Sequence, residues 1–498
     1  MPGTYKVGQR FLGATTAFAA LALTLAAARF TGIDAPQQAA IDRISADSMR
    51  GDLSFLASDL LDGRGTPSSG LDLAAEFIAS RFRRAGLEPA GSQGSYFQEA
   101  NFAVVTPNVS DLSIKLEQDS AELDLDSADV RVESLDSIDL KDTPVLKLPD
   151  TGAIPEVTGK VVAADSRRWG DELLLAQLQS RKPAMILLMS RRRRPKSSDR
   201  VLEPLDLYAA PVLRLYNQDA VAALGKHGDI KVSVHLAAPA RRNIILRNVA
   251  GILRGSDPAL ASQAIVLSAH YDHLGEEPPG PGDRIFNGAN DNGSGVVSVT
   301  EIAAALATLT PRPRRTILFI AFFGEEGGLF GSYYYVRHPI IPLKDTVANI
   351  NLEQMGRTDD AGGKEIGAFA FTGPSYSDLP ALISSAARAE GVKTWSNASA
   401  DEFFDRSDNY AFALHGVVAH TIVVAFEYPD YHAVGDDWRK IDYANMAKVD
   451  RGVAAGLLAI ADSRDRPKWS DSEDAARYRE AAAPNQDAAR YREARGAK

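Results

Sequence analysis

Two adjacent glutamates, Glu325 and Glu326, stand in the segment FIAFFGEEGGLFGS, which runs from residue 319 to residue 332. The apolar residues 316–323 predict a buried strand, so both carboxylates emerge at its carboxyl end. Adjacent side chains in an extended or turning chain point in different directions. One carboxylate can therefore bind a metal while the other accepts a proton from water, and a hydrolase needs both roles. An acidic first turn of the following helix would account for the same pair without any chemistry.

A histidine and two aspartates follow the apolar segment QAIVLSA. His270 lies just past the end of this predicted strand, where open α/β sheets place their sites. Asp272 could orient the imidazole of His270 as a supporting carboxylate. Asp291 comes 21 residues after His270 in NGANDNGSG, whose glycines permit close backbone approach on both sides of the acid. Asp291 could equally cap the helix that follows it.

Further candidates end or follow later apolar runs. Glu353 ends the predicted strand in NINLEQMGR, and Tyr431 and His432 stand in the loop after the predicted strand 417–425. Tyr431 could donate a hydrogen bond to a developing oxyanion, or it could simply pack. Five candidate ligands thus follow successive strands of one sheet: His270, Asp291, Glu326, Glu353 and His432. Their oxygen and imidazole donors suit a pair of zinc ions, and no nucleophile elbow or phosphate-binding glycine loop competes with this interpretation.

The elements that must position these residues form an α/β pattern in residues 241–463. Continuous apolar runs such as RTILFIAFF and TVANINL predict strands that are covered on both faces, with helical segments between them. The pattern predicts a mostly parallel, twisted sheet with helices on both faces. Amphipathic helices are expected in residues 40–109, which we assign to the same domain as its N-terminal part.

Residues 110–240 have a different texture. Short alternating strands such as DLSIKLEQ and KVVAAD are interleaved with helix-like segments, which predicts a small β-rich α/β module. The basic segment at 190–200 is typical of a solvated loop or of an interaction patch. The polar tail 464–498 contains DAARYREA twice, at 474–481 and 487–494, and is expected to be a solvated extension, partly helical or disordered.

The whole composition narrows the class of protein. A chain of 498 residues suggests two or three domains, and a formal net charge of −10 argues against nucleic acid as a partner. The chain has no cysteine, so disulfides, thiolate metal sites and a cysteine nucleophile are excluded. Any metal must then be held by histidine, aspartate and glutamate. The oligomeric state is left open by the sequence.

The N-terminus has the pattern of a targeting segment. Lys6 and Arg10 precede an apolar run from Phe11 to Ala28, which ends in an A-x-A-like site. Residues 1–28 are therefore expected to be a signal peptide or an N-terminal anchor, and the protein is expected to be exported to the periplasm or secreted. Association with a membrane is expected only if this segment is not cleaved.

Six motifs carry a resemblance to a known family: AHYDHLG, NGANDNGSG, FGEEGGLFGS, NINLEQMGR, FDRSDNYAFALHGV and DYHAVGDDWRKID. In this order and spacing they resemble the co-catalytic dizinc aminopeptidases, which include bacterial leucyl-type enzymes and whose relatives are glutamate carboxypeptidase, glutaminyl cyclase and the transferrin receptor ectodomain. The motifs cover most of residues 241–445. The resemblance implies a zinc-exopeptidase fold of the phosphorylase/hydrolase-like type for 241–463, and a protease-associated domain inserted at 110–240.

The resemblance also implies a ligand set for two zinc ions. His270 and Glu353 would hold one ion, and Glu326 and His432 would hold the other. Asp291 would bridge the two. Many members have aspartate where this chain has Glu353, and this departure puts full occupancy of one zinc position in doubt.

The remaining roles implied by the resemblance belong to three residues. Glu325 would be the general base, Asp272 would orient His270, and Tyr431 would stabilise the oxyanion. The implied activity is hydrolysis of N-terminal peptide bonds in peptide substrates. Glutaminyl cyclase and carboxypeptidase or dipeptidase activity are alternatives on the same scaffold, whereas a non-catalytic binding ectodomain would be expected to have lost ligands that this chain retains.

Overall fold

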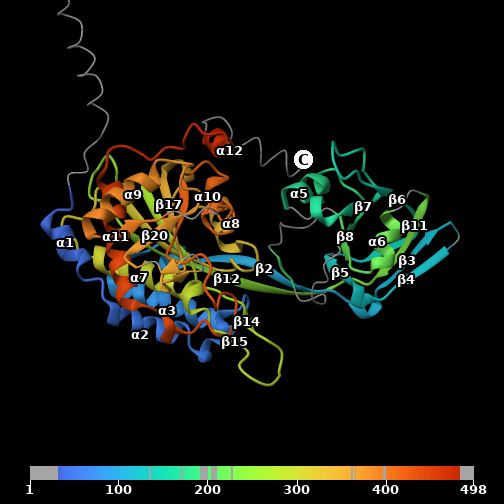
Figure 1. Cartoon of the computed structure of the whole chain (residues 1–498), viewed down its shortest axis with the longest axis horizontal. Coiled ribbons are helices and arrows are strands. Elements are labelled where there is room, and N and C mark those ends of the chain that lie inside the picture. The colour runs from blue at the N-terminus through green and yellow to red at the C-terminus, as the bar shows by residue number, and fades with distance from the viewer. Residues whose placement is uncertain are drawn as a thin grey trace, which may run out of the picture.

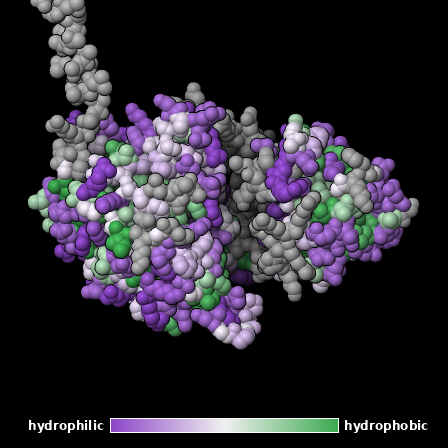
Figure 2. Space-filling view, viewed as in Figure 1, coloured by the Kyte–Doolittle hydropathy of each residue, from purple (hydrophilic) through white to green (hydrophobic). Residues whose placement is uncertain are grey.

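The computed structural model describes residues 32–119, 121–133, 136–169, 172–190, 200–202, 210–225, 228–360, 363–364, 366–395 and 400–482. Figure 1 shows two bodies, each built around its own sheet. The face seen in Figure 2 is mainly hydrophilic, with hydrophobic residues scattered over it. The predicted signal segment 1–28 lies outside the described residues, as do residues 191–199 of the basic segment. No helix among the described residues is long and apolar enough to span a bilayer.

The larger sheet has ten strands and carries the predicted site residues. In spatial order its main path is β21 (Lys393–Thr394), β20 (Ala368–Phe371), β22 (Ala419–Val423), β17 (Thr346–Glu353), β13 (Ala264–His270), β16 (Thr316–Phe322), β12 (Ala240–Leu253), β2 (Phe97–Thr106) and β9 (Arg200–Leu202). The short strand β1 (Glu88–Pro89) pairs with β12. The central strands β22, β17, β13 and β16 are parallel, which confirms the predicted parallel sheet at its centre. The sheet as a whole is mixed, because β20 on one side and β12, β2 and β9 on the other pair antiparallel.

Two layers of helices cover the larger sheet (Figure 1). On one face, α2 (Ala46–Leu56), α3 (Ser69–Ala85), α7 (Gly295–Leu306) and α11 (Tyr443–Asp462) pack together, with α1 (Ala35–Ile41) and α9 (Leu379–Ala387) against α11. On the other face, α8 (Phe330–Arg337) packs on α10 (Asn409–Ala413). Strands β13, β16 and β17 are buried along their whole length between these layers, as continuous apolar runs require.

Capping chemistry sets the boundaries of the N-terminal helices. The Ser45 side chain accepts a hydrogen bond from the backbone N–H of Ser48 and begins α2. Gly86, with a φ of 76°, ends α3 in the left-handed conformation that favours glycine. Between these helices the turn Asp59–Arg64 brings Arg64 under the predicted site.

The smaller sheet has eight strands in the order β4 (Ala121–Leu125), β3 (Ser113–Gln118), β11 (Ile230–Leu236), β6 (Ile138–Lys147), β7 (Val161–Asp165), β8 (Met185–Met189), β10 (Val212–Leu215) and β5 (Val130–Glu133). Helices α4 (Ser166–Trp169), α5 (Glu172–Ser180) and α6 (Gln218–Gly225) accompany it. Its buried residues form cores separate from that of the larger body. The identity of this module as a protease-associated domain stays a prediction.

The start of the predicted tail differs from the expected solvated extension. Residues 464–482, which include α12 (Ala476–Ala481), pack on the larger body. Trp469 and Tyr478 are buried in its hydrophobic core, and the indole N–H of Trp469 donates to the Gly416 carbonyl oxygen at 3.0 Å. These two aromatic side chains anchor a segment that is otherwise polar, and the Ser470 N–H, which donates to the Tyr376 carbonyl oxygen, adds a backbone contact. Residues 483–498 lie outside the described part of the chain.

Candidate metal centre

The carboxyl ends of the four central parallel strands meet at one edge of the larger sheet. His270 and Glu353 are the last residues of β13 and β17. The segment between β13 and α7 supplies Asp272 and Asp291, and the segments after β16 and β22 supply the remaining predicted side chains. A cavity of about 320 Å³ opens there and is lined by seven of the predicted residues: His270, Asp291, Glu325, Glu326, Glu353, Tyr431 and His432. Asp272 is fully buried behind His270. The fold thus brings together residues that lie up to 162 positions apart in the sequence.

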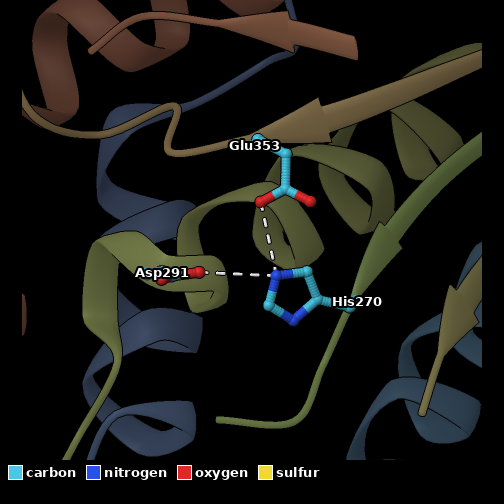
Figure 3. Close-up of side chains that lie close together, drawn as sticks. All are labelled: His270, Asp291 and Glu353. Atoms are coloured by element: carbon cyan, nitrogen blue, oxygen red, sulfur yellow. Dashed lines mark ion pairs between the residues drawn. The ribbon is translucent and has the colours of Figure 1, made fainter. Parts of the chain in front are cut away.

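An inner group is formed by His270, Asp291 and Glu353 (Figure 3). The Nε2 atom of His270 lies 3.4 Å from Oδ1 of Asp291 and 3.3 Å from Oε2 of Glu353. All three side chains are buried, and one donor atom from each lies within 4.8 Å of the others. Ser407 Oγ donates to the remaining oxygen of Glu353 at 2.6 Å, and Asn351 donates to it at 3.2 Å. The second carboxylate oxygen of Glu353 is thereby left directed at His270.

An outer group is formed by His432, Glu326 and the same Asp291. The Nε2 atom of His432 lies 3.1 Å from Oδ2 of Asp291 and 3.3 Å from Oε2 of Glu326. His273 also belongs to this region, because its Nδ1 atom lies 2.8 Å from Oε1 of Glu326. His273, Asp291 and Glu326 likewise bring one donor atom each within 4.8 Å of one another. Two imidazoles therefore face the outer position, one half-exposed and one buried.

Glu325 stands beside both groups and belongs to neither. Its Oε2 atom is 3.8 Å from Nε2 of His270. Asp272 connects the two residues, since its Oδ1 atom accepts the backbone N–H of Glu325 at 3.0 Å and lies 3.6 Å from Nδ1 of His270. Thr66 donates to the other oxygen of Asp272 at 3.2 Å. The two adjacent glutamates thus have different surroundings, as their sequence position predicted.

Tyr431 lies at the mouth of the cavity with 37% of its surface exposed. Its ring stacks on that of His432, with centroids 4.0 Å apart. Burial of the hydroxyl and the negative charges of Asp291 and Glu326 raise the pKa of Tyr431. The phenol therefore keeps its proton at neutral pH and can act as a hydrogen-bond donor.

Three buried partners fix the loop that carries Asp291. The Asp436 carboxylate accepts the backbone N–H groups of Asn290 and Asp291 at 3.0 Å. Arg64 donates to the carbonyl oxygens of residues 56, 271, 287 and 288. Gly288 has a φ of 56°, and a Cβ atom there would lie 2.5 Å from the His273 ring. The position of Asp291 is therefore set by backbone contacts and needs a glycine at this point.

The charges of the candidate ligands are strongly coupled. Burial alone would lower the pKa of His270, but Glu353 and Glu325 raise it well above its ordinary value. Hydrogen bonds to Asp291 and Glu326 raise the pKa of His432 to about 10. Burial alone would raise the pKa of Asp291, but His270 and His432 lower it below its usual range. The carboxylates of this site thus favour positive charge among them.

The donor set fits divalent cations. Every candidate ligand atom is a carboxylate oxygen or an imidazole nitrogen, which are ligands that zinc accepts. Burial raises the pKa of one more acid behind the inner group, Asp408, to about 7, although His270 opposes the shift. So many buried carboxylates are costly unless positive charge accompanies them. The two groups could each hold one ion, with Asp291 between them.

Sequence reasoning missed several residues of this site. His273 stands in the motif AHYDHLG, only three residues after His270, and this proximity was the signal for it. Asp436, in DYHAVGDDWRKID, and Arg64, in LLDGRGT, carry no comparable signal. Both act on backbone atoms that lie far away in the sequence, and only the folded structure shows such contacts.

The chain has partial matches among known protein families and curated proteins. Residues 248–457 match the model of Peptidase family M28. A vacuolar membrane protease of Aspergillus flavus is 30% identical over 207 residues, which are 41% of this chain and 21% of that protein. Aminopeptidase YwaD of Bacillus subtilis is 39% identical over 93 residues, which are 18% of each chain. The matched regions cover between 11% and 21% of the length of the curated relatives.

One solved structure supports the fold of nearly the whole chain. The aminopeptidase from Aneurinibacillus sp. strain AM-1 superposes with a TM-score of 0.54 at 17% sequence identity. The superposition covers 84% of this chain and 95% of that one. At this level of identity the likeness concerns the fold.

Proposed function

Because residues 248–457 match the model of Peptidase family M28, we propose that the protein is an exported, zinc-dependent aminopeptidase of that family. It hydrolyses N-terminal peptide bonds of peptide substrates at a dinuclear site, with Glu325 as the general base. The names of relatives support peptide-bond hydrolysis, since the Bacillus subtilis protein is called an aminopeptidase and the Aspergillus flavus protein a protease.

The observation that carries this proposal is the position of Asp291 between the two groups. Its Oδ1 atom faces His270 of the inner group, and its Oδ2 atom faces His432 of the outer group. A carboxylate that offers one oxygen to each side is the arrangement that a bridging ligand between two metal ions needs. His270 and Glu353 would hold one zinc ion, and Glu326 and His432 the other.

The chemistry divides between the metal ions and this chain's own side chains. When bound, a zinc pair polarises the scissile carbonyl and lowers the pKa of water. Glu325 belongs to neither ligand group, so its carboxylate remains available to accept the proton of the attacking water. Glu325 then delivers that proton to the nitrogen of the leaving amine as the peptide bond breaks.

The surroundings of Glu325 suit a base. Burial raises the pKa of Glu325 well above its usual range, and the carboxylates of Glu326 and Glu353 add to this shift, whereas His270 opposes it. A carboxylate whose pKa is raised accepts a proton from water more readily than an ordinary glutamate. Tyr431, protonated at the mouth of the cavity, donates a hydrogen bond to the oxyanion that forms on the substrate.

The substitution Glu325→Gln tests this assignment. The variant is expected to bind the same amount of zinc as the native protein, because the residue belongs to neither ligand group. Its turnover of aminoacyl amides is expected to fall by about 10²- to 10⁴-fold, the usual contribution of a general base. Glu276→Gln, an exposed position, is the matched control and should leave turnover unchanged. Native-like turnover by Glu325→Gln would refute the assignment.

Substrate assays separate the aminopeptidase from its alternatives. A leucine-initiated and a glutamine-initiated peptide, assayed side by side, distinguish release of a residue from cyclisation to pyroglutamate. Mass spectrometry of a longer peptide shows which end is shortened. Trimming from the carboxyl end would establish a carboxypeptidase in place of an aminopeptidase.

Export is proposed from residues 1–28, which have the pattern of a signal segment. The Aspergillus flavus relative is named a vacuolar membrane protease, and this location is said of that protein alone. N-terminal sequencing of the protein recovered from the periplasm or the medium tests export and cleavage together. Recovery of an intact N-terminus in the cytosol would refute both.

A further inference from the structure

The octapeptide DAARYREA occurs twice near the end of the chain, at 474–481 and at 487–494. The first copy folds partly as α12 and packs on the larger body, whereas the second copy lies outside the described residues. If the repeated residues themselves make the contacts of the first copy, the second copy can make the same contacts.

The first copy inserts Tyr478 into an aromatic socket formed by Tyr376, Phe404 and Trp469. Tyr478 is fully buried, and its ring centroid lies 5.1 Å from that of Trp469 and 5.3 Å from that of Phe404. The ring of Tyr376 is 6.3 Å away. None of these socket residues belongs to the repeat, so the socket exists independently of which copy fills it.

Neighbouring residues of the first copy complete the contact. Ala475 is fully buried, and the guanidinium of Arg477 lies over the ring of Tyr410, 5.6 Å from its centroid. Arg479 donates hydrogen bonds to the carbonyl oxygens of Ser470 and Ser472. The side chains that make these contacts all belong to residues that the second copy repeats.

The second copy repeats these determinants at the same spacing as Ala488, Arg490, Tyr491 and Arg492. We propose that the aromatic socket is a binding site for either copy, and that residues 487–494 of the same chain occupy it when the first copy leaves. The tail then has two alternative registers on one socket, with Tyr478 or Tyr491 as the inserted ring.

The number of residues between Ser470 and each tyrosine permits this exchange at a moderate cost in loop-closure entropy. Ser470 is held in place, since its N–H donates to the Tyr376 carbonyl oxygen at 2.7 Å. Tyr478 follows Ser470 by 8 residues, and Tyr491 follows it by 21. Because closure of a flexible loop becomes less probable with the 3/2 power of its length, the first register is favoured by about fourfold. The second register should therefore appear mainly when the first is weakened.

The socket also adjoins the wall of the cavity. Phe404, which contacts Tyr478, is flanked in sequence by Phe403 and Asp405, and both of these residues line the cavity. A filled socket thus supports the segment that forms this wall. Exchange between the copies keeps the support in place while the tail moves.

A cycle of tyrosine substitutions in the full chain tests the proposal. Tyr478→Ala, Tyr491→Ala and the double variant are compared with the native protein through the indole N–H signal of Trp469, which reports its hydrogen bond to Gly416. Tyr491→Ala should leave the signal unchanged. Tyr478→Ala should retain the bound signal with socket occupancy weakened by about fourfold, and the double variant should lose it. Gln486→Ala, between the copies, is the matched control and should behave as the native protein.

Three results would overturn the proposal. The first is a Tyr478→Ala variant that has already lost as much bound signal as the double variant. The second is failure of a synthetic DAARYREA peptide to restore the signal in the double variant, a measurement that also serves if that variant is poorly stable. The third is a concentration-dependent dimer in Tyr478→Ala that requires Tyr491, which would place the second copy in the socket of another molecule.

Discussion

The inner and outer groups of the candidate metal centre share Asp291 but differ in how they are held. The inner residues His270 and Glu353 end two central strands and are 1% and 7% exposed. In the outer group, Glu326 and His432 stand on loops, and the side chain of His432 is 38% exposed. The sheet itself fixes the inner position, whereas the outer position depends on loops and on supporting residues such as His273. We therefore expect the outer ion to exchange faster than the inner one.

Asp291→Asn should have the largest effect on turnover, because it alters a residue that the inner and outer groups share. The amide removes the negative charge that both ions share. Turnover is expected to fall by more than about 100-fold, beyond the loss usual for outer-shell partners. Elemental analysis should find both positions depleted of zinc. Asp283→Asn on an exposed loop is the control, and retention of a full zinc pair by Asp291→Asn would contradict the bridging role.

His432→Ala should affect the outer group and leave the inner group intact. The outer position loses a ligand, while His270 and Glu353 of the inner position are untouched. The variant is expected to retain the inner zinc and lose the outer one, with turnover reduced by about 10- to 100-fold or more. Titration with a chelator, followed by metal analysis, measures the two populations. Equal loss of both ions would show that the groups are not independent.

His273→Leu should weaken the outer position selectively. The substitution removes the hydrogen bond to Oε1 of Glu326, a contact that orients the ligand. Loss of such a supporting partner typically weakens metal binding by about 10- to 100-fold. His273→Asn places an N–H donor near the Nδ1 position and is expected to recover part of the affinity. Equal affinities of the two variants would mean that the hydrogen bond has no role.

The pH dependence of zinc binding, taken per pH unit, should be the smallest effect and should sharpen the contrast. In the metal-free protein, ion pairing raises the pKa of His432 from 6.5 to about 10. Its contribution to the stability of the metal-free fold is therefore full below pH 6.5 and lost as the pH rises towards 10. Zinc requires the neutral imidazole, so outer-site affinity should rise by up to about tenfold per pH unit in this window. Calorimetry in buffers of different ionisation enthalpy measures the released proton, and zinc binding without proton release would contradict the assignment.

The sequence was most informative where residues end apolar strands. The type and position of His270 and Glu353 could be predicted because buried parallel strands are continuous apolar runs that end at one edge. The antiparallel pairing of the strands at the two sides of the sheet could not be predicted. The sequence of β12, for example, does not reveal in which direction the neighbouring strands run. Arg64 and Asp436 were missed because they bind backbone atoms, which any sequence supplies.

The tail shows a second limit of composition. Residues 464–482 are polar enough to predict a solvated extension, yet Trp469 and Tyr478 are buried. A few large rings can bury enough apolar area to hold a short segment when a matching socket exists. The socket is built from residues 376 and 404 of the larger body together with Trp469, so the tail sequence alone does not reveal it.

The contacts of Arg64 bear on how small a working unit of this protein can be made. A fragment that begins at residue 248 would contain all five candidate ligands. It would lack the guanidinium that holds the carbonyl groups of residues 287 and 288, three to four positions before Asp291. The hydrophobic face of α3 would be missing as well. The smallest fragment that can organise its own metal loop must therefore reach back past Arg64, almost two hundred residues before the region that matches the family model.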